Sequence, residues 1–328
     1  MSFPPLECIM GHRMYSLADP WAADDAPLSP ADLADLATLG RRAYIDADPT
    51  ARRDAEHLLY AINIANCFAP PLHARAAHAW TTLMRDKLGA LRRAFGGCEP
   101  IDAPTMSQRL LDAVARWGAY NHPVIAQLRA RPDDLRAYRI WAKNWYGSCV
   151  GFSAQLAALV QRTSGPAKKV VIENLADEFD DKVTHDVLRI RFYESLDLRF
   201  DAASAIDDPD RVLEATELLN ARTGLSFLRD PIWAFGCFYG VEANWPHECR
   251  LHLEINRARG GIGADDHTLE YWLSHATADD HHAAEWLDAL VAMCKTPEQR
   301  AAAVDGALIQ LRLRWQLYDA IARRIGSV

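Results

Sequence analysis

Residues 267–293, HTLEYWLSHATADDHHAAEWLDALVAM, contain the most informative helical pattern of this chain. His275, Asp279 and His282 occupy positions i, i+4 and i+7, which lie on one face of an α-helix. The large apolar residues Trp272 and Trp286 continue the same face. Apolar residues at this spacing indicate a helix surface that packs against the rest of the protein. The stretch therefore predicts a buried helix face that carries three side chains able to bind a metal.

The same helical period extends over most of the chain, and few segments alternate with the period of a strand. Ser29-Pro30 is a typical helix start, because serine caps the first turn and proline fits the first helical position. A pair of helices is expected over residues 51–95, interrupted by Pro70-Pro71. A capping box at Thr296 predicts a last helix that runs to about Ile325. We therefore predict an all-α protein.

The clearest internal break is the glycine- and proline-containing run at residues 96–104. It separates a shorter N-terminal part from a longer helical part. We therefore expect an N-terminal auxiliary helical segment at residues 1–105 and a main helical domain at residues 106–328.

Composition excludes several classes of protein. Half of the 328 residues are hydrophobic, which supplies a core and excludes wholesale disorder. The net charge of -8 argues against a nucleic-acid partner. The sequence contains no run of 18 apolar residues, so no membrane-spanning helix is expected. The N-terminal residues do not have the pattern of a secretory signal, so none is expected. The seven scattered cysteines contain no CxxC pair. We therefore expect a cytoplasmic protein with reduced thiols and neither a nucleic-acid nor a membrane partner.

Two further segments place acidic or imidazole side chains on apolar helix faces. Residues 170–196, VVIENLADEFDDKVTHDVLRIRFYESL, are expected to form one helix in which Glu178 and His185 stack two turns apart. Glu242 follows an aromatic, glycine-containing helical segment and is a third inward carboxylate. Burying such groups without partners is costly, so their positions require an explanation.

The three segments together supply three carboxylates and three imidazoles. The set is Glu178, His185, Glu242, His275, Asp279 and His282. Oxygen and imidazole ligands suit iron or manganese, and a mixture of this kind is typical of carboxylate-bridged di-iron sites in helical bundles. The alternative interpretation is a set of core polar groups that satisfy one another.

This pattern resembles the haem-oxygenase-like di-iron oxidase and oxygenase superfamily, whose members are also called iron-containing redox enzymes. That family has Glu and His seven residues apart on its first core helix, a lone Glu on the second and HxxxDxxH on the third. These positions correspond to Glu178 and His185, to Glu242, and to His275, Asp279 and His282. The similarity extends over about residues 135–322 and includes the flanking sequences NLADE (174–178) and YGVE (239–242).

The chain departs from the family pattern directly after Glu178. Phe179 stands where many members have glycine. Asp181 follows on the helix face expected for Glu178 and His185, so it is a candidate for an additional or substitute ligand.

The resemblance implies a haem-oxygenase-like helical bundle without haem, two Fe(II) ions per chain and O2 as co-substrate. It also implies a small-molecule substrate in specialised biosynthesis. Family members either N-oxygenate amines and guanidines or cleave C–C bonds oxidatively. We favour an amino-acid-like or amine substrate over a fatty acid. An external electron donor and a homodimer are both compatible with this hypothesis.

Two alternatives stay open at the level of sequence. One is a metal-free enzyme of the same fold, either thiaminase-like with Cys149 or Cys237 as nucleophile or a cofactorless oxidase. The other is a non-catalytic helical binding protein. Of the remaining notable residues, Trp141 and Trp145 are expected in the core. Lys143 and Arg189 are expected to be solvated, although either would suit a substrate carboxylate.

Overall fold

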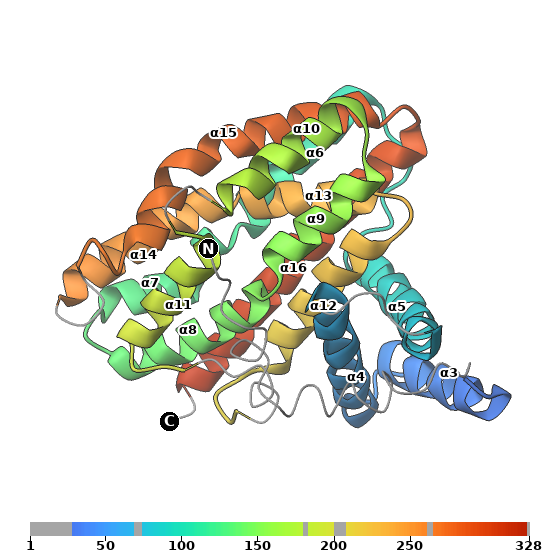
Figure 1. The fold of residues 1–328 in the computed structure, drawn as a ribbon, viewed down its shortest axis with the longest axis horizontal. Coiled ribbons are helices and arrows are strands. Elements are labelled where there is room, and N and C mark those ends of the chain that lie inside the picture. Colours follow the sequence, from blue (N-terminus) through green and yellow to red (C-terminus); the bar gives the residue numbers. More distant parts are fainter. Residues whose placement is uncertain (1–27, 69–73, 180–182, 200–207, 261–264, 327–328) are drawn as a thin grey trace.

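The computed structural model describes residues 28–68, 74–179, 183–199, 208–260 and 265–326 (Figure 1). All regular structure in these residues is helical, which confirms the all-α prediction. The helices are α3 (Pro30–Tyr44), α4 (Pro49–Phe68), α5 (Ala74–Phe95), α6 (Ala103–Trp117), α7 (Pro123–Ala130), α8 (Leu135–Cys149), α9 (Phe152–Arg162), α10 (Gly165–Asp177), α11 (His185–Ser195), α12 (Leu213–Phe227), α13 (Ile232–Glu242), α14 (Trp245–Arg259), α15 (Glu270–Met293) and α16 (Pro297–Gly326), with a 3-10 turn η1 (Ala119–Asn121).

Two helix starts that the sequence predicts are formed by the expected capping residues. The Asp32 amide donates to Ser29 Oγ at 3.1 Å, and the Ser29 amide donates to Asp32 Oδ2 at 3.0 Å. The Thr296 amide donates to Gln299 Oε1 at 3.2 Å, and the Gln299 amide donates to Thr296 Oγ1 at 3.3 Å. Each reciprocal pair satisfies two backbone donors that the first turn leaves free. The starts of α3 and α16 are therefore local properties of the sequence.

The prediction of a single helix over residues 170–196 is wrong. Helix α10 ends at Asp177 and α11 begins at His185, with Thr184 in an extended conformation before it. The His185 amide donates to the Glu178 carbonyl at 3.1 Å and so closes the connection. Thr184 is the N-cap residue of α11, and its β-branched side chain is compatible with the extended conformation found there. Glu178 and His185 therefore face each other across a break rather than stacking along one helix.

Helices α13 and α16 cross very closely because each has a glycine at the contact. A Cβ atom added at Gly236 would lie 1.9 Å from the Ala303 carbonyl oxygen. A Cβ atom added at Gly306 would lie 2.1 Å from the Trp233 carbonyl oxygen. Real Cβ atoms do not approach backbone oxygens at these distances, so only glycine permits the crossing. The crossing sets the position of α13, whose last residue is Glu242.

Replacing Gly236 with alanine is expected to lower the free energy of unfolding by about 1–3 kcal/mol, because the added methyl group forces the two backbones apart. Urea denaturation monitored by circular dichroism measures this change. Gly89→Ala in α5 is the matched control, since its Cβ would meet only Arg93 Nη1 at 3.4 Å. The control should be neutral or slightly stabilising because alanine favours helix over glycine. Equal effects of the two substitutions would contradict the close-crossing explanation.

Helices α3–α5 contain a hydrophobic core cluster of their own and lie against α12 and α16 (Figure 1). Polar contacts join them to α12. The Arg52 guanidinium donates to Glu217 Oε2 at 2.7 Å, and Asn220 Nδ2 donates to Glu56 Oε2 at 2.8 Å. Lys87 pairs with the same Glu56 carboxylate at 2.6 Å from Oε2. These helices therefore cover α12, while the division at residue 105 stays a prediction.

None of the helices in the described ranges combines the length and the apolar character that a membrane crossing requires.

Candidate metal centre

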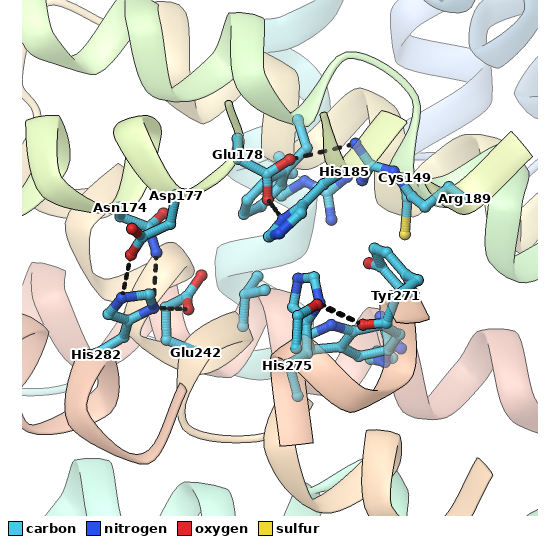
Figure 2. Close-up of a pocket in the computed structure, with 16 residues that line it drawn as sticks. Cys149, Asn174, Asp177, Glu178, His185, Arg189, Glu242, Tyr271, His275 and His282 are labelled. Atoms are coloured by element: carbon cyan, nitrogen blue, oxygen red, sulfur yellow. Dashed lines mark hydrogen bonds and ion pairs between the residues drawn. The ribbon is translucent and has the colours of Figure 1, made fainter. Parts of the chain in front are cut away.

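A cavity of about 200 Å³ lies among the helices of the main bundle (Figure 2). Five of the six residues predicted as ligands line it, namely Glu178, His185, Glu242, His275 and His282. They come from the end of α10, the start of α11, the end of α13 and the middle of α15. All five are less than one tenth exposed. The structure therefore brings together residues that lie more than a hundred positions apart in the chain.

The first group of ligand-type atoms consists of Glu178, His185 and His275. One carboxylate oxygen and one nitrogen from each imidazole lie within 4.8 Å of one another. A metal–nitrogen bond is about 2.1 Å long, so small adjustments bring three such atoms onto one ion. Figure 2 shows the three side chains directed toward the same space.

The Glu178 carboxylate is held ionised by its neighbours. Its Oε1 lies 3.2 Å from His185 Nδ1, and its Oε2 accepts from Arg189 Nη2 at 3.4 Å. Burial alone would raise the pKa of Glu178, but the Arg189 guanidinium and the His185 ring outweigh it and lower the pKa to about 2. At neutral pH the carboxylate is therefore in the form that binds a cation.

His275 is held in one tautomer by the backbone. Its Nδ1 donates to the Tyr271 carbonyl oxygen at 2.8 Å, which leaves the lone pair on Nε2. Burial, helped by the neighbouring His185 ring at 4.5 Å, lowers the pKa of His275 to about 3. A neutral imidazole with a backbone bond to its other nitrogen is the arrangement that metal-binding histidines use.

The second group consists of Glu242, His282 and Asp177. Asp177 Oδ2 lies 2.8 Å from His282 Nε2, and Glu242 Oε2 lies 3.5 Å from His282 Nδ1. The side-chain amide of Asn174 lies 3.2 Å from the same Nδ1. Two carboxylates and an imidazole therefore form a second cluster of oxygen and nitrogen atoms in the same cavity (Figure 2).

Two predicted positions fall outside what the structure describes. Asp279 belongs to α15, one turn from both His275 and His282, but its side chain is not among the described residues. Asp181, the candidate substitute ligand, lies in the undescribed residues 180–182. Both assignments stay predictions.

Sequence reasoning missed Asp177 and misjudged Arg189. Arg189 was expected in solvent, yet it is 3 % exposed and pairs with Glu178 and Asp186. Its position four residues after His185 places both on one face of α11, which is the signal that was available. Lys143, the other basic residue in question, forms ion pairs with Asp208 and Asp210.

Aromatic side chains form a wall beside the first group. Trp141 and Trp145 are fully buried and stacked at 5.6 Å, which confirms their place in the core. Trp145 also stacks at 6.1 Å on Trp245, and Trp245 lines the cavity together with Tyr271. Such a wall limits water around the ligand atoms and strengthens their electrostatic interactions.

The two cysteines considered as nucleophiles differ in position. Cys149 lines the cavity. Cys237 is not part of the cavity lining, and its thiol lies 3.6 Å from Gln310 Oε1. Burial raises the pKa of Cys237 to about 12, so its thiol is protonated and unreactive at neutral pH. Only Cys149 is therefore placed to contact a molecule in the cavity.

The donor set fits iron. Carboxylates and imidazoles are ligands of non-haem iron proteins, and such sites do not need the thiolates that many zinc and iron–sulfur sites use. Apart from the exposed Asp177, the carboxylates and imidazoles of the two groups are buried, and such groups are expensive to keep in a core without partners. The residues present are therefore chemically suited to hold iron.

Comparison with solved structures shows the fold. A TenA homolog from Pseudomonas syringae pv. tomato DC3000 matches 70 % of this chain and 98 % of its own, with a TM-score of 0.58 and 13 % identity. A CADD-like protein of unknown function from Nostoc punctiforme matches 67 % and 97 %, with a TM-score of 0.54 and 14 % identity. A domain of unknown function with a heme oxygenase-like fold from Shewanella denitrificans OS217 matches 69 % and 94 %, with a TM-score of 0.53 and 16 % identity. The bundle is therefore haem-oxygenase-like, as predicted.

A search of curated proteins finds no match to this chain. The family model of iron-containing redox enzymes matches residues 139–315, which are 177 of the 328 residues. The match contains all six residues predicted as ligands. The chain belongs to the family of iron-containing redox enzymes.

Proposed function

We propose that this protein is a non-haem di-iron oxidase or oxygenase that activates O2 and acts on a small organic substrate. The observation that carries the proposal is the buried group of Glu178, His185 and His275, whose ligand atoms lie close enough to hold an ion. Glu242 and His282 line the same cavity and add a second carboxylate–imidazole pair. Glu178, His185 and His275 would hold one ion. Glu242 and His282 would hold the other, with Asp279 as the carboxylate available to complete it.

Iron held here would supply the electrons and the coordination sites that reduce O2. The residues of the chain have separate tasks. Arg189 keeps the Glu178 carboxylate ionised, and the Tyr271 carbonyl orients the His275 ring. Asp177 orients the His282 ring through Nε2, so Nδ1, the nitrogen beside Glu242 and the Asn174 amide, would be the one that binds an ion. Trp245 and Tyr271 present aromatic surface to the space in which the substrate would react, which would limit water there.

An amino-acid-like or amine substrate agrees with the size of the cavity. Sites for drug-sized ligands occupy about 300–1,000 Å³, and this cavity is smaller, at about 200 Å³. N-oxygenation and oxidative C–C cleavage are the two proposed reactions. The proposed setting is a biosynthetic pathway in the cytoplasm, and an external donor would supply the electrons. A product assay with arginine-type, lysine-type and medium-chain fatty-acid substrates separates them, since each reaction leaves a different product mass.

The position of Cys149 supports a second candidate, a metal-free enzyme of the thiaminase type. Its thiol lines the same cavity and lies 3.9 Å from Ser148 Oγ. That candidate predicts turnover without iron and loss of turnover in Cys149→Ser.

Anaerobic titration with Fe(II) tests the proposal directly. We expect uptake of about two ions per chain, as in carboxylate-bridged di-iron bundles. Rapid mixing of the loaded protein with O2 should then give a transient visible absorbance band. Glu178→Gln should lower the uptake, because an amide cannot replace the charge of the carboxylate.

The proposal would be overturned if the native protein takes up no iron and Glu178→Gln behaves in the same way. It would leave the metal-free enzyme or the non-catalytic binding protein as explanations. Iron content measured after gel filtration, rather than colour alone, decides between these outcomes.

A further inference from the structure

Helix α12 carries an arginine in the middle of a fully enclosed segment. Every residue from Ala215 to Ser226 is buried. Arg222 itself is 1 % exposed, yet it also lines the cavity that contains the candidate metal ligands. A guanidinium in such a place requires a partner, because burying a charge without one is costly.

In the described part of the chain, the hydrogen-bond partners of Arg222 are neutral. Its Nε donates to Gln155 Oε1 at 2.7 Å, and its Nη2 donates to the Ser148 carbonyl oxygen. The Phe152 ring lies below the guanidinium at 5.4 Å. Within the described ranges, no carboxylate forms an ion pair with Arg222. The positive charge is hydrogen-bonded but not neutralised.

The other two arginines of the cavity differ in this respect. Arg314 forms two parallel bonds of 2.7 Å to the Glu248 carboxylate. Arg189 pairs with Glu178 and Asp186. Both guanidinium groups are therefore balanced by the chain itself, and Arg222 is the arginine whose charge is left for a ligand.

The surroundings of Arg222 are unfavourable to a lone cation. Burial, with a further contribution from Arg314 and Arg189, lowers the pKa of Arg222. An anion at the cavity wall would reverse this effect, since opposite charges in a medium of low dielectric attract strongly. Guanidinium groups bind carboxylates with particular strength because two N–H donors match the two oxygens.

We propose that Arg222 binds the carboxylate of a small acidic substrate inside the cavity. The inference rests on the proposed function for the assignment of the cavity as the reaction site, and it narrows the substrate class to small carboxylates. Because Arg222 and the candidate metal ligands line one cavity of about 200 Å³, the rest of an anchored molecule must lie close to those ligands. Arg222 thereby determines which end of the substrate faces the metal ligands.

Calorimetric titration with butyrate and with its neutral isostere butyramide tests the proposal. The full-length protein is used as purified and again after EDTA treatment, which removes direct binding of a carboxylate by metal. We expect butyrate to bind about tenfold or more tightly than butyramide in both preparations, the difference that a charge-assisted hydrogen bond contributes. Arg222→Gln should abolish this preference, and Arg222→Lys should retain part of it.

Arg312→Gln is the matched control, because it removes the same charge from an arginine that stacks on Trp117 away from the cavity. It should keep the preference of the native protein. Equal binding of the two probes by the native protein, including binding of neither, overturns the proposal. A preference that survives in Arg222→Gln overturns it as well. If Arg222→Gln does not fold, the comparison of butyrate with butyramide is made in the native protein and in Arg222→Lys. An undiminished preference in Arg222→Lys would count against binding of the carboxylate by two N–H donors of the guanidinium.

The outcome is separable from that of the iron titration. If the native protein takes up two iron ions but does not prefer butyrate over butyramide, the anion site is rejected and the di-iron proposal stands. An intact preference in a protein that takes up no iron rejects the di-iron proposal and leaves the anion site standing.

Discussion

Replacing His275 with alanine is expected to abolish iron-dependent O2 consumption. His275 contributes the nitrogen that completes the cluster with Glu178 and His185, and its Nδ1–H bond to Tyr271 already orients it for that role. Loss of an outer partner of a metal ligand costs about 10- to 100-fold in activity or affinity, so loss of the ligand itself should cost more. His282→Ala should act in the same way on the second cluster. An oxygen electrode, with Fe(II)-loaded protein and a reductant, measures the rates.

His281→Ala is the control for this pair of substitutions. It removes an imidazole next to His282 on the same helix, but His281 is exposed and pairs with Glu285 at 3.0 Å. Its rate should equal that of the native protein. Circular dichroism should show native helix content for all three variants, because the cavity walls are otherwise intact. Unchanged O2 consumption in both His275→Ala and His282→Ala would refute the metal assignment.

Replacing Arg314 with methionine should lower the free energy of unfolding by about 3–5 kcal/mol, the largest stability effect we expect from a single substitution. Glu248 is completely buried, and its two oxygens accept from Arg314 at 2.7 Å each. Tyr318 and Asn244 donate to the same carboxylate. Without the guanidinium, two neutral donors would have to hold a charge in the core. Chemical denaturation with urea gives the free energy.

Two further variants identify the cause of that loss. Arg312→Met removes a half-buried arginine that has no carboxylate partner in the described part of the chain, so its effect should be small. Glu248→Leu combined with Arg314→Met removes both charges and should recover much of the lost stability, because apolar side chains often replace a buried ion pair at little cost. A loss below about 1 kcal/mol in Arg314→Met would mean that water or a rearranged side chain compensates Glu248.

The local pattern of residues was sufficient for the all-α fold and for most of the candidate ligands. The i, i+4, i+7 spacing of His275, Asp279 and His282 specifies a shared helix face wherever the helix lies. Ser29 and Thr296 specify helix starts through bonds to residues three positions away. These properties depend on neighbours in the chain, so they can be read without knowledge of the fold.

Only the folded chain decided how the ligand-type residues meet and which charges balance them. We predicted that Glu178 and His185 stack along one helix. Because the chain breaks between α10 and α11, the two side chains instead face each other across the break. Asp177, the partner of His282, lies 105 positions away in the chain and could not be assigned from spacing along one helix. The unbalanced charge of Arg222 became visible only once α8, α9 and α12 were packed together. Burial and electrostatic pairing depend on atoms that are distant in sequence, so they follow from tertiary packing and not from the helical period.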